Sequence, residues 1–323
     1  MENSIRIAVG QLRELTNKDL QFAAQVGVKG VQLNNPNLPG DTRWEYMDLL
    51  QLRTRAEDAG MRLEALENTP ISFYDHAMLG LPDRDKQIEN YQETIRNVGR
   101  AGIPILGFHW MPNQVWRTSQ TTPGRGGSKV TSFDMELAKT SPVTHGREYS
   151  AEELWATYCY FIDAVVPVAE EAGVSLALHP DDPPVESLGG VARIMNSFEN
   201  FKRAMEYRDS PKLGLDFCMG CWSEMMGGGC LEAMEYFGPK GKIFYVHFRD
   251  VQGTVPKFQE CFLGEGNVNL TRAILTLKKA RFTGFLIDDH VPAMVDDSQY
   301  GHRARALAIG HMSGLLAAID ELA

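Results

Sequence analysis

The 323-residue sequence contains no run of about 18 apolar residues, the length that a membrane-spanning helix requires. Its first residues have neither the basic nor the apolar stretch of a signal peptide. It has only five cysteines, an odd and small number for a chain of this length. This pattern argues against a disulfide framework. We therefore expect a cytoplasmic protein with free thiols and no membrane partner.

The sequence also lacks an excess of positive charge. It has 32 Lys and Arg against 42 Asp and Glu, which gives a net charge of −10. An acidic balance disfavours nucleic acid and anionic membrane surfaces as partners, so we expect a small-molecule ligand instead. Hydrophobic residues make up 43% and charged residues 23% of the chain, which is ordinary for a globular protein with a large core.

Short apolar segments alternate with amphipathic segments along the whole chain. The predicted strands cover residues 5–9, 30–33, 63–66, 104–108, 175–178, 213–215, 243–248 and 285–288. The predicted helices cover residues 18–25, 44–59, 84–101, 151–172, 191–207, 231–237, 270–280 and 303–322. This alternation predicts an α/β fold in which a single domain, residues 1–323, closes as a (β/α)8 TIM barrel. An open doubly wound sheet is the alternative, but no Gly-x-Gly-x-x-Gly motif follows the first strand.

Residues 113–149 interrupt this alternation. They are rich in Gly, Ser, Thr and Pro, and they are too many for an ordinary connection between a strand and a helix. We expect them to form a long loop, inserted after the fourth strand, over the mouth of the barrel. A phosphate-binding loop is the weaker alternative, because Gly-Lys-Ser/Thr and a following helix start are missing.

Polar side chains follow almost every predicted strand. They are Gln11, Asn34, Asn35, Glu67, Asn68, His109, Trp110, His179, Asp216, Cys218, His247, Arg249, Asp289 and His290. The active site of a TIM barrel lies at the carboxyl ends of its strands. The sequence therefore predicts a functional site at this end of the barrel.

Four of these side chains are of the types that bind first-row metals. His179, Cys218, His247 and Asp289 follow the fifth to eighth strands, so they should point to one place. Ligands from different strands leave coordination positions open, as a catalytic metal requires. The alternative is that each is a buried polar residue with a structural role. A redox pair of Cys218 and Cys221 is less well supported, because there is no second Cys-x-x-Cys motif and no thioredoxin-like context.

Further side chains near the barrel mouth are candidates to bind substrate. Period-two alternation places Arg249 on the mouth side of its strand, where its planar guanidinium suits a carboxylate or a phosphate. The alternative for Arg249 is an ion pair with Asp250 or another acid. His109, Trp110 and Arg117 are candidates to contact a polyhydroxy acid, although a packing role for the tryptophan is an equal alternative.

Several motifs are unusual in combination. They include Trp116-Arg117-Thr118, His179-Pro180-Asp181-Asp182-Pro183-Pro184, Phe217-Cys218-Met219-Gly220, Val246-His247-Phe248-Arg249 and Asp289-His290-Val291-Pro292. In these motifs, and over most of its length, the chain resembles the D-mannonate dehydratase family of xylose-isomerase-like barrels. The resemblance implies a Mn2+-dependent hydro-lyase that removes water from D-mannonate, a sugar acid, to give 2-keto-3-deoxy-D-gluconate. Barrels of this class often associate, so we also expect a homo-oligomer.

The resemblance also implies roles for individual residues. It implies the same four metal ligands that the strand ends predict. It implies His290 and a tyrosine, best matched by Tyr300, as the acid and base. Which of the two is the base stays open, although an ordinary histidine pKa suits proton abstraction near neutrality better than that of a tyrosine. For such a reaction we predict Arg249 as a further catalytic residue, which would stabilise the developing enediolate charge together with the metal. The donor set does not fix the metal, and Co2+, Ni2+ or Zn2+ are alternatives to Mn2+.

Other functions remain open from the sequence. The substrate could be another aldonate, or the barrel could be a metal-dependent sugar isomerase or epimerase. Such enzymes commonly use carboxylate-rich sites, which the cysteine of the proposed ligand set fits poorly. A non-catalytic barrel that binds a sugar acid is the third alternative. Loss of water, reversible isomerisation, or binding without change would distinguish the three.

Overall fold

The computed structural model describes residues 5–322 and shows a closed barrel of eight parallel strands, as predicted. The barrel strands are β1 (Arg6–Leu12), β2 (Gly30–Asn34), β3 (Arg62–Glu67), β4 (Ile105–Phe108), β7 (Ser175–Leu178), β10 (Leu213–Cys218), β11 (Ile243–His247) and β14 (Phe285–Ile287). They follow one another around the barrel in chain order, and β1 pairs with both β2 and β14. The carboxyl ends of all eight strands therefore meet at one end of the barrel.

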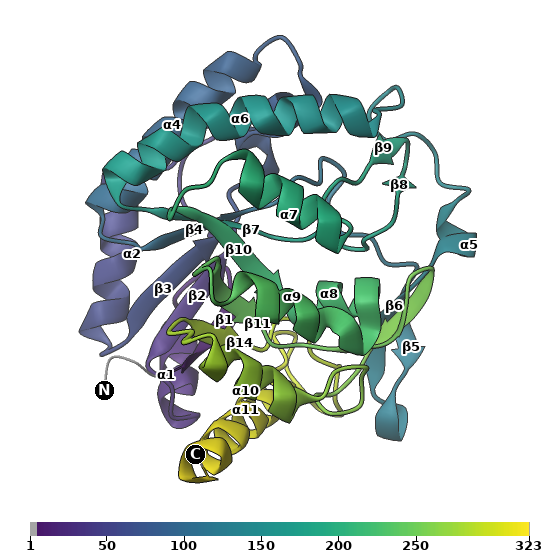
Figure 1. Cartoon of the computed structure of the whole chain (residues 1–323). Coiled ribbons are helices and arrows are strands. Elements are labelled where there is room, and N and C mark those ends of the chain that lie inside the picture. The colour runs from purple at the N-terminus through teal and green to yellow at the C-terminus, as the bar shows by residue number, and fades with distance from the viewer. Residues whose placement is uncertain (1–4, 323) are drawn as a thin grey trace.

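Helices surround the strands (Figure 1). The helices of at least eight residues are α1 (Asn17–Gln25), α2 (Tyr46–Asp58), α4 (Arg84–Arg100), α6 (Ala151–Ala172), α7 (Phe198–Tyr207), α8 (Met219–Met226), α9 (Cys230–Phe237), α10 (Leu270–Lys279) and α11 (His302–Leu322). Two shorter helices are α3 (Asp75–Leu79) and α5 (Met135–Ala138). Single 3-10 turns cover Ile71–Phe73, Arg125–Gly127 and Gly227–Gly229. None of the helices described is long and apolar enough to cross a bilayer.

One predicted helix is wrong at its N-terminus. Residues 191–207 were expected to be helical throughout, but α7 begins at Phe198. The Ser197 side chain accepts a hydrogen bond from the amide of Asn200 at 3.3 Å, which caps the helix there. Val191 and Ala192 instead form the short strand β9, which pairs with β8 (Ser187–Leu188).

The interior of the barrel is filled by small and large side chains from different strands. Ala8, Ala65 and Ala177 leave room for Tyr245 and Phe285, whose rings stack with centroids 5.0 Å apart. A Cβ added to Gly107 on β4 would lie 2.8 Å from the Tyr245 hydroxyl oxygen on β11. Since β4 and β11 are not neighbours, Tyr245 reaches across the barrel. The interior is therefore a packed core that forms the floor of the mouth.

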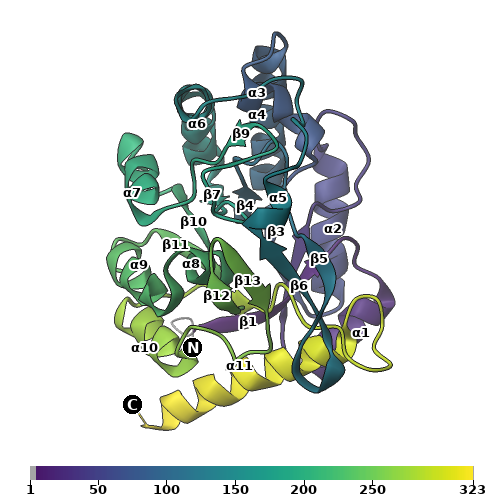
Figure 2. The same cartoon turned by 90° about the vertical axis from the view of Figure 1, so that its right-hand side faces the viewer.

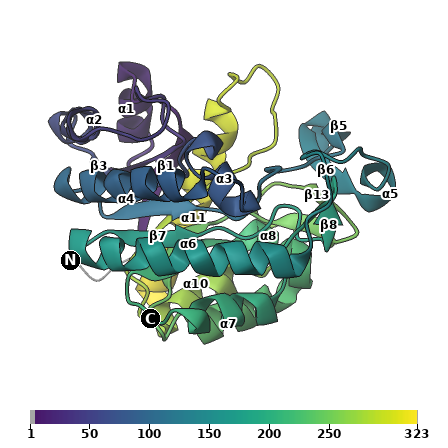
Figure 3. The same ribbon diagram turned by 90° about the horizontal axis from the view of Figure 1, so that it is seen from above.

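The segment 113–149 is not the structureless loop that we expected. Its strands β5 (Ser119–Pro123) and β6 (Lys129–Asp134) form a hairpin, which joins β13 (Lys257–Glu260) and β12 (Val251–Thr254) in a four-stranded antiparallel sheet. Phe133 and Phe258 stack with ring centroids 5.8 Å apart and give the sheet a small core. Figure 2 shows the strands of this insertion sheet facing the viewer, and Figure 3 shows β5, β6 and β13 at one edge of the molecule. The insertion is therefore ordered by strands that come from two distant parts of the chain.

Candidate active site and metal centre

A cavity of about 470 Å³ opens at the carboxyl ends of the barrel strands. The polar residues that line it include Gln11, Asn34, Asn35, Glu67, Asn68, His109, His179, Asp182, Asp289 and His290. Most of these are the strand-end residues from which the sequence predicted a site. We refer to this cavity as the main cavity.

The backbone bends sharply where four strands end in the main cavity. Gln11, Asn35, Asn68 and Asp289 have φ angles of 59°, 45°, 61° and 49°. Positive φ is uncommon for residues other than glycine, and such residues gather at functional sites. Each of the four lines the main cavity, so the unusual backbone serves to present side chains there.

The four predicted metal ligands come together beside the main cavity, which His179 and Asp289 line and from which Cys218 and His247 are buried. One ligand atom from each of His179, Cys218 and His247 lies within 4.8 Å of the others, and all three residues are buried. The carboxylate Oδ2 of Asp289 lies 3.4 Å from His247 Nδ1 and 3.9 Å from Cys218 Sγ. This arrangement of two imidazoles, a thiol and a carboxylate matches what the sequence predicted.

Hydrogen bonds leave one nitrogen of each histidine ring available to a metal. His179 Nδ1 lies 2.6 Å from the carbonyl oxygen of Pro180, and His247 Nε2 lies 2.8 Å from Glu67 Oε2. If these nitrogens carry the ring protons, His179 Nε2 and His247 Nδ1 keep their lone pairs. His247 Nδ1 is buried and has no hydrogen-bond partner. The donor set therefore fits a divalent first-row cation.

The surroundings also favour the charged forms of the two anionic candidates. Burial alone would raise the pKa of the Cys218 thiol, but a hydrogen bond from Cys221 and the positive charge of Arg249 hold it well below its ordinary value. Burial would likewise raise the pKa of Asp289, but the charges of His290 and His247 hold it well below. A thiolate and a carboxylate are the forms that bind metals.

Arg249 does not offer an open guanidinium to a substrate. It is 2% exposed, and its Nε donates to Asp289 Oδ2 at 2.8 Å. Its Nη1 donates to Glu224 and Glu260 at 3.0 and 2.9 Å, and its Nη2 to Asp182 at 3.0 Å. This geometry gives no support to the predictions that Arg249 binds a substrate carboxylate or stabilises charge on the substrate, because every guanidinium nitrogen already donates to an acid. The alternative of an ion pair is correct, although the partners are these four acids.

Two of the three predicted substrate-binding residues are also engaged elsewhere. The Arg117 side chain is 4% exposed and forms ion pairs with Asp182 and Glu260. Trp110 is fully buried, and its Nε1 donates to the carbonyl oxygen of Leu154 at 3.2 Å. Neither of them lines the main cavity, so both predictions are corrected to structural roles.

His109 is the predicted substrate-binding residue that does line the main cavity. Its Nδ1 accepts a hydrogen bond from the amide of Met111 at 3.2 Å, so the ring proton is on Nε2. Burial and the nearby charge of His179 lower the pKa of His109 to about 3. A neutral imidazole with one N–H can donate a hydrogen bond to a hydroxyl group.

The two candidate acid–base residues are placed very differently. His290 lines the main cavity, and its Nδ1 lies 2.9 Å from Glu260 Oε1. Burial alone would lower the pKa of His290, but the charges of Asp289 and Glu260 raise it above its ordinary value. The Tyr300 hydroxyl instead donates to the carbonyl oxygen of Gly10 at 2.7 Å and does not line the main cavity. The structure therefore supports His290, and not Tyr300, as an acid–base group in this conformation.

Amide side chains form the opposite wall of the main cavity, a feature that the sequence analysis noted without assigning a role. Asn34 Nδ2 donates to Gln11 Oε1 at 2.6 Å, and Asn68 Nδ2 donates to Asn34 Oδ1 at 3.2 Å. Gln11 Nε2 donates in turn to Glu67 Oε2 at 3.1 Å. This amide wall, formed by Gln11, Asn34 and Asn68, can exchange hydrogen bonds with hydroxyl groups.

Two acids support the site. Glu67 holds His247, and the sequence placed Glu67 at a strand end without predicting this contact. Glu260 holds His290 but lies in the insertion sheet, where no sequence signal pointed to the site.

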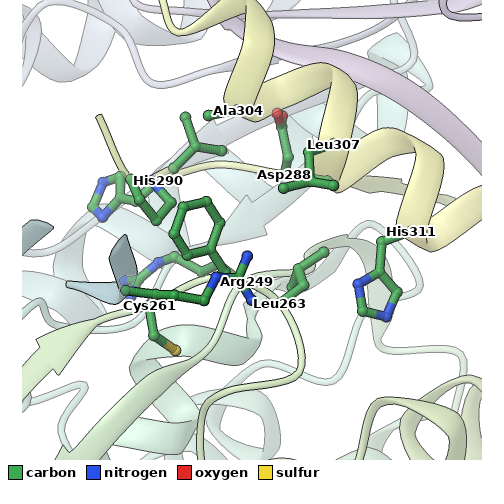
Figure 4. A pocket seen from close by; sticks show the side chains of 13 residues that line it. Arg249, Cys261, Leu263, Asp288, His290, Ala304, Leu307 and His311 are labelled. Carbon is green, nitrogen blue, oxygen red and sulfur yellow. The ribbon is translucent and has the colours of Figure 1, made fainter. Parts of the chain in front are cut away.

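A second cavity of about 220 Å³ lies behind His290. Figure 4 shows His290 and Arg249 at its edge, with Leu263 and Leu307 among its apolar lining. Asp288 turns its carboxylate toward α11, where Arg305 Nη1 donates to it at 3.0 Å. His290 therefore lines both cavities, and the second one has a mixed lining of apolar and charged side chains.

Comparisons with known proteins agree with this site. The family model described as D-mannonate dehydratase (UxuA) matches residues 9–144 and 137–323. The mannonate dehydratase of Thermotoga petrophila is 31% identical over 334 residues, which cover 92% of this chain and 92% of that protein. The mannonate dehydratase of Streptococcus suis strain 05ZYH33 is 31% identical over 326 residues, covering 91% and 88%.

The solved structures similar to this chain include a mannonate dehydratase and proteins that share only the barrel fold. The crystal structure of mannonate dehydratase from Streptococcus suis serotype 2 has a TM-score of 0.90 and 30% identity, covering 97% of this chain and 93% of that one. A D-tagatose 3-epimerase-like protein has a TM-score of 0.62 and 16% identity, covering 98% and 99%. The second similarity shows a shared barrel fold alone.

Proposed function

The chain belongs to the D-mannonate dehydratase family, and from this premise we propose that it is a metal-dependent hydro-lyase that converts D-mannonate to 2-keto-3-deoxy-D-gluconate and water. The observation that carries the proposal is the meeting of His179, Cys218, His247 and Asp289 directly beside the main cavity, which His179, Asp289 and His290 line. The substrate and the identity of the metal rest on the family.

His179, Cys218, His247 and Asp289 would hold the metal. A divalent cation bound there would act as a Lewis acid and stabilise the negative charge that develops on a substrate carboxylate. We propose Mn2+, as in the family that the chain resembles. The donor set alone would bind Zn2+ more tightly under the usual order of metal affinities, so selection depends on which metal the cell supplies.

His290 would move the proton. The C2–H bond of an aldonate is weakly acidic, so its cleavage needs a base within hydrogen-bond reach. His290 takes this proton from C2. As the C3–O bond breaks, the proton that His290 then carries passes to the departing hydroxyl group, which leaves as water. The resulting enol then rearranges to the 2-keto acid. Because Tyr300 donates its hydroxyl hydrogen to Gly10, we assign it no proton transfer.

The amide wall would bind the hydroxyl groups of the substrate. Amides both donate and accept hydrogen bonds, as hydroxyl groups do. No Lys or Arg side chain is among the described residues that line the main cavity, so recognition there depends on neutral groups and histidines. This composition suits a polyhydroxy chain better than a phosphorylated sugar.

We propose in addition that the chain acts in the cytoplasm as a homo-oligomer, as barrels of this class often do. Light scattering coupled to size-exclusion chromatography would measure the mass in solution. A mass equal to a single chain of 36.1 kDa would contradict the oligomer.

The product decides between a dehydratase and its alternatives. We expect the protein, incubated with D-mannonate and Mn2+, to form a product that is lighter by one water and reacts as a 2-keto-3-deoxy acid. His290→Asn should abolish this product while its metal content stays that of the parent protein. An isomer of unchanged mass would indicate an isomerase or epimerase, and no change despite bound substrate would indicate a binding protein.

A further inference from the structure

We propose that Glu260 is a positioning residue for His290: its carboxylate accepts the Nδ1–H of the ring and leaves Nε2 as the atom that exchanges a proton with substrate. This inference rests on the proposed function of His290, but the contact itself can be measured without turnover. Glu260 does not line the main cavity and is not expected to touch substrate.

The distances distinguish the two ring nitrogens of His290. Nδ1 lies 2.9 Å from Glu260 Oε1, within hydrogen-bond range. Nε2 lies 3.7 Å from Asp289 Oδ1, which is too long for a hydrogen bond. The His290 side chain is 38% exposed and that of Glu260 is 4% exposed. The ring is thus held from its buried side and remains accessible to the main cavity.

Glu260 is itself held in the form that can accept this hydrogen bond. Its Oε1 also accepts from Arg117 Nη2 and Arg249 Nη1, each at 2.9 Å. Burial alone would raise the pKa of Glu260, but the charges of Arg249 and His290 bring it below its ordinary value. An ionised carboxylate only accepts hydrogen bonds, so its histidine partner must donate.

The insertion sheet fixes the position of Glu260. Glu260 is the last residue of β13. In the same strand, Lys257 and Phe258 pair with Asp134 and Phe133 of β6. The sheet therefore holds a carboxylate behind His290 while staying outside the cavity. An acceptor in this position fixes the tautomer and orientation of a catalytic imidazole, as the aspartate of a Ser-His-Asp triad does.

The tautomer of His290 tests the contact directly. In metal-free protein labelled with 15N-histidine, two-bond 1H–15N spectra at pH 9 report which ring nitrogen carries the proton, and His290→Asn identifies the signals. We expect Nδ1–H in the wild type. We expect the same in the control Glu224→Gln, because Glu224 contacts Arg249 without touching His290. Glu260→Ala should lose the preference for Nδ1–H.

Kinetics test whether the contact matters for turnover. We expect Glu260→Ala to lower kcat by about 10- to 100-fold, as loss of an outer hydrogen-bond partner does at metal sites, with KM and metal content little changed. Glu260→Gln keeps an acceptor oxygen, so its kcat should be intermediate. Glu260→Met, which has a side chain of similar length and no carboxylate oxygen, replaces Glu260→Ala in both assays if Glu260→Ala fails to fold.

The outcomes separate this proposal from the proposed function. A proton on Nε2 in the wild type, or an unchanged tautomer in Glu260→Ala, would overturn the role of Glu260. A folded Glu260→Ala enzyme with unchanged kcat would also overturn it. If the wild type does not dehydrate D-mannonate, the proposed function fails, while the spectra still decide whether Glu260 holds His290.

Discussion

The two sides of the barrel mouth present different kinds of side chain. The ends of β7, β10, β11 and β14 carry ionisable side chains that meet at one point, among them Cys218 and His247. At or after the ends of β1, β2 and β3 lie the amides of Gln11, Asn34 and Asn68, which bond to one another. The carboxyl ends of one barrel can therefore supply reactive groups on one side and groups for substrate recognition on the other. We call the ends of β7, β10, β11 and β14 the ionisable side, which faces the amide wall defined above.

Glu67 connects the two sides. Its Oε2 accepts from Gln11 Nε2 at 3.1 Å and lies 2.8 Å from His247 Nε2. The amide wall therefore also contributes to the orientation of a metal ligand. The predictions below test how far the two sides can be separated.

The largest effect on activity should come from the ionisable side. His247→Asn removes a metal ligand, and a metal supplies several kcal/mol of transition-state stabilisation. Since 1.36 kcal/mol corresponds to a tenfold change in rate, we expect kcat/KM to fall on the order of 10³-fold, with loss of bound metal. Atomic absorption and a product assay measure the two effects. As a control, His311→Gln alters a histidine outside the main cavity and should keep both the bound metal and the kcat/KM of the wild type.

The ionisable side should also depend on its buried ion pairs for stability. Arg249→Met removes one cation from the buried acids Asp182, Glu224, Glu260 and Asp289 and leaves Arg117 to pair with the first three. Breaking a buried pair costs about 3–5 kcal/mol, which urea unfolding would detect. The half-exposed pair of Arg96 and Glu93 provides the control, because Arg96→Met should cost less than about 1 kcal/mol. Equal costs would show that the buried network is not a special requirement of this side.

Substitutions in the amide wall should have smaller effects that leave the metal in place. Asn34→Ala removes hydrogen bonds worth roughly 1 kcal/mol each, so we expect KM for D-mannonate to rise about fivefold. Asn34→Asp should be worse, because it adds a carboxylate where Asn34 Nδ2 now lies 3.2 Å from Glu67 Oε1. Loss of metal in Asn34→Ala would mean that the two sides cannot be separated.

The smallest effect concerns His109, which follows β4 between the two sides. Its pKa is lowered to about 3 in the folded protein and is about 6.5 in an unfolded chain. Between these two pKa values His109 binds a proton in the unfolded chain but not in the folded protein. The free energy of unfolding is therefore highest above pH 6.5 and falls as the pH decreases below it. The loss is roughly 1.4 kcal/mol at pH 5.5.

Unfolding by urea at pH 7.5 and pH 5.5, in the presence of a chelator, measures this loss. The wild type should lose more stability between the two pH values than His109→Asn does. The half-buried His145, which lies outside the main cavity, serves as the control, and His145→Asn should behave like the wild type. If His109→Asn lost as much stability as the wild type between pH 7.5 and pH 5.5, the prediction would be contradicted.

The sequence predicted the barrel and the close approach of four candidate metal ligands, because both depend on local patterns. Each strand is a short apolar run, and His179 and Asp289 lie directly after such runs. The position of each candidate at a strand end could therefore be predicted from neighbouring residues alone. The barrel fold then places all these strand ends together.

The sequence failed where distant partners decide the outcome. Arg249 occupies a strand end like a ligand, but its partners lie in α8, β13 and the loops after β7 and β14. The mostly polar residues of β5 have no apolar alternation, since the sheet is stabilised by pairing with β6 and by the stacked Phe133 and Phe258. Glu260 was missed for the same reason.

The most direct test of the account is a metal titration of the stripped protein. The protein is freed of metal, Mn2+ is added stepwise, and the 2-keto-3-deoxy acid formed from D-mannonate is followed. We expect no product without metal and a rate that saturates at one Mn2+ per chain. Product formation in the presence of a chelator, or no product at full metal occupancy, would contradict a metal-dependent dehydratase.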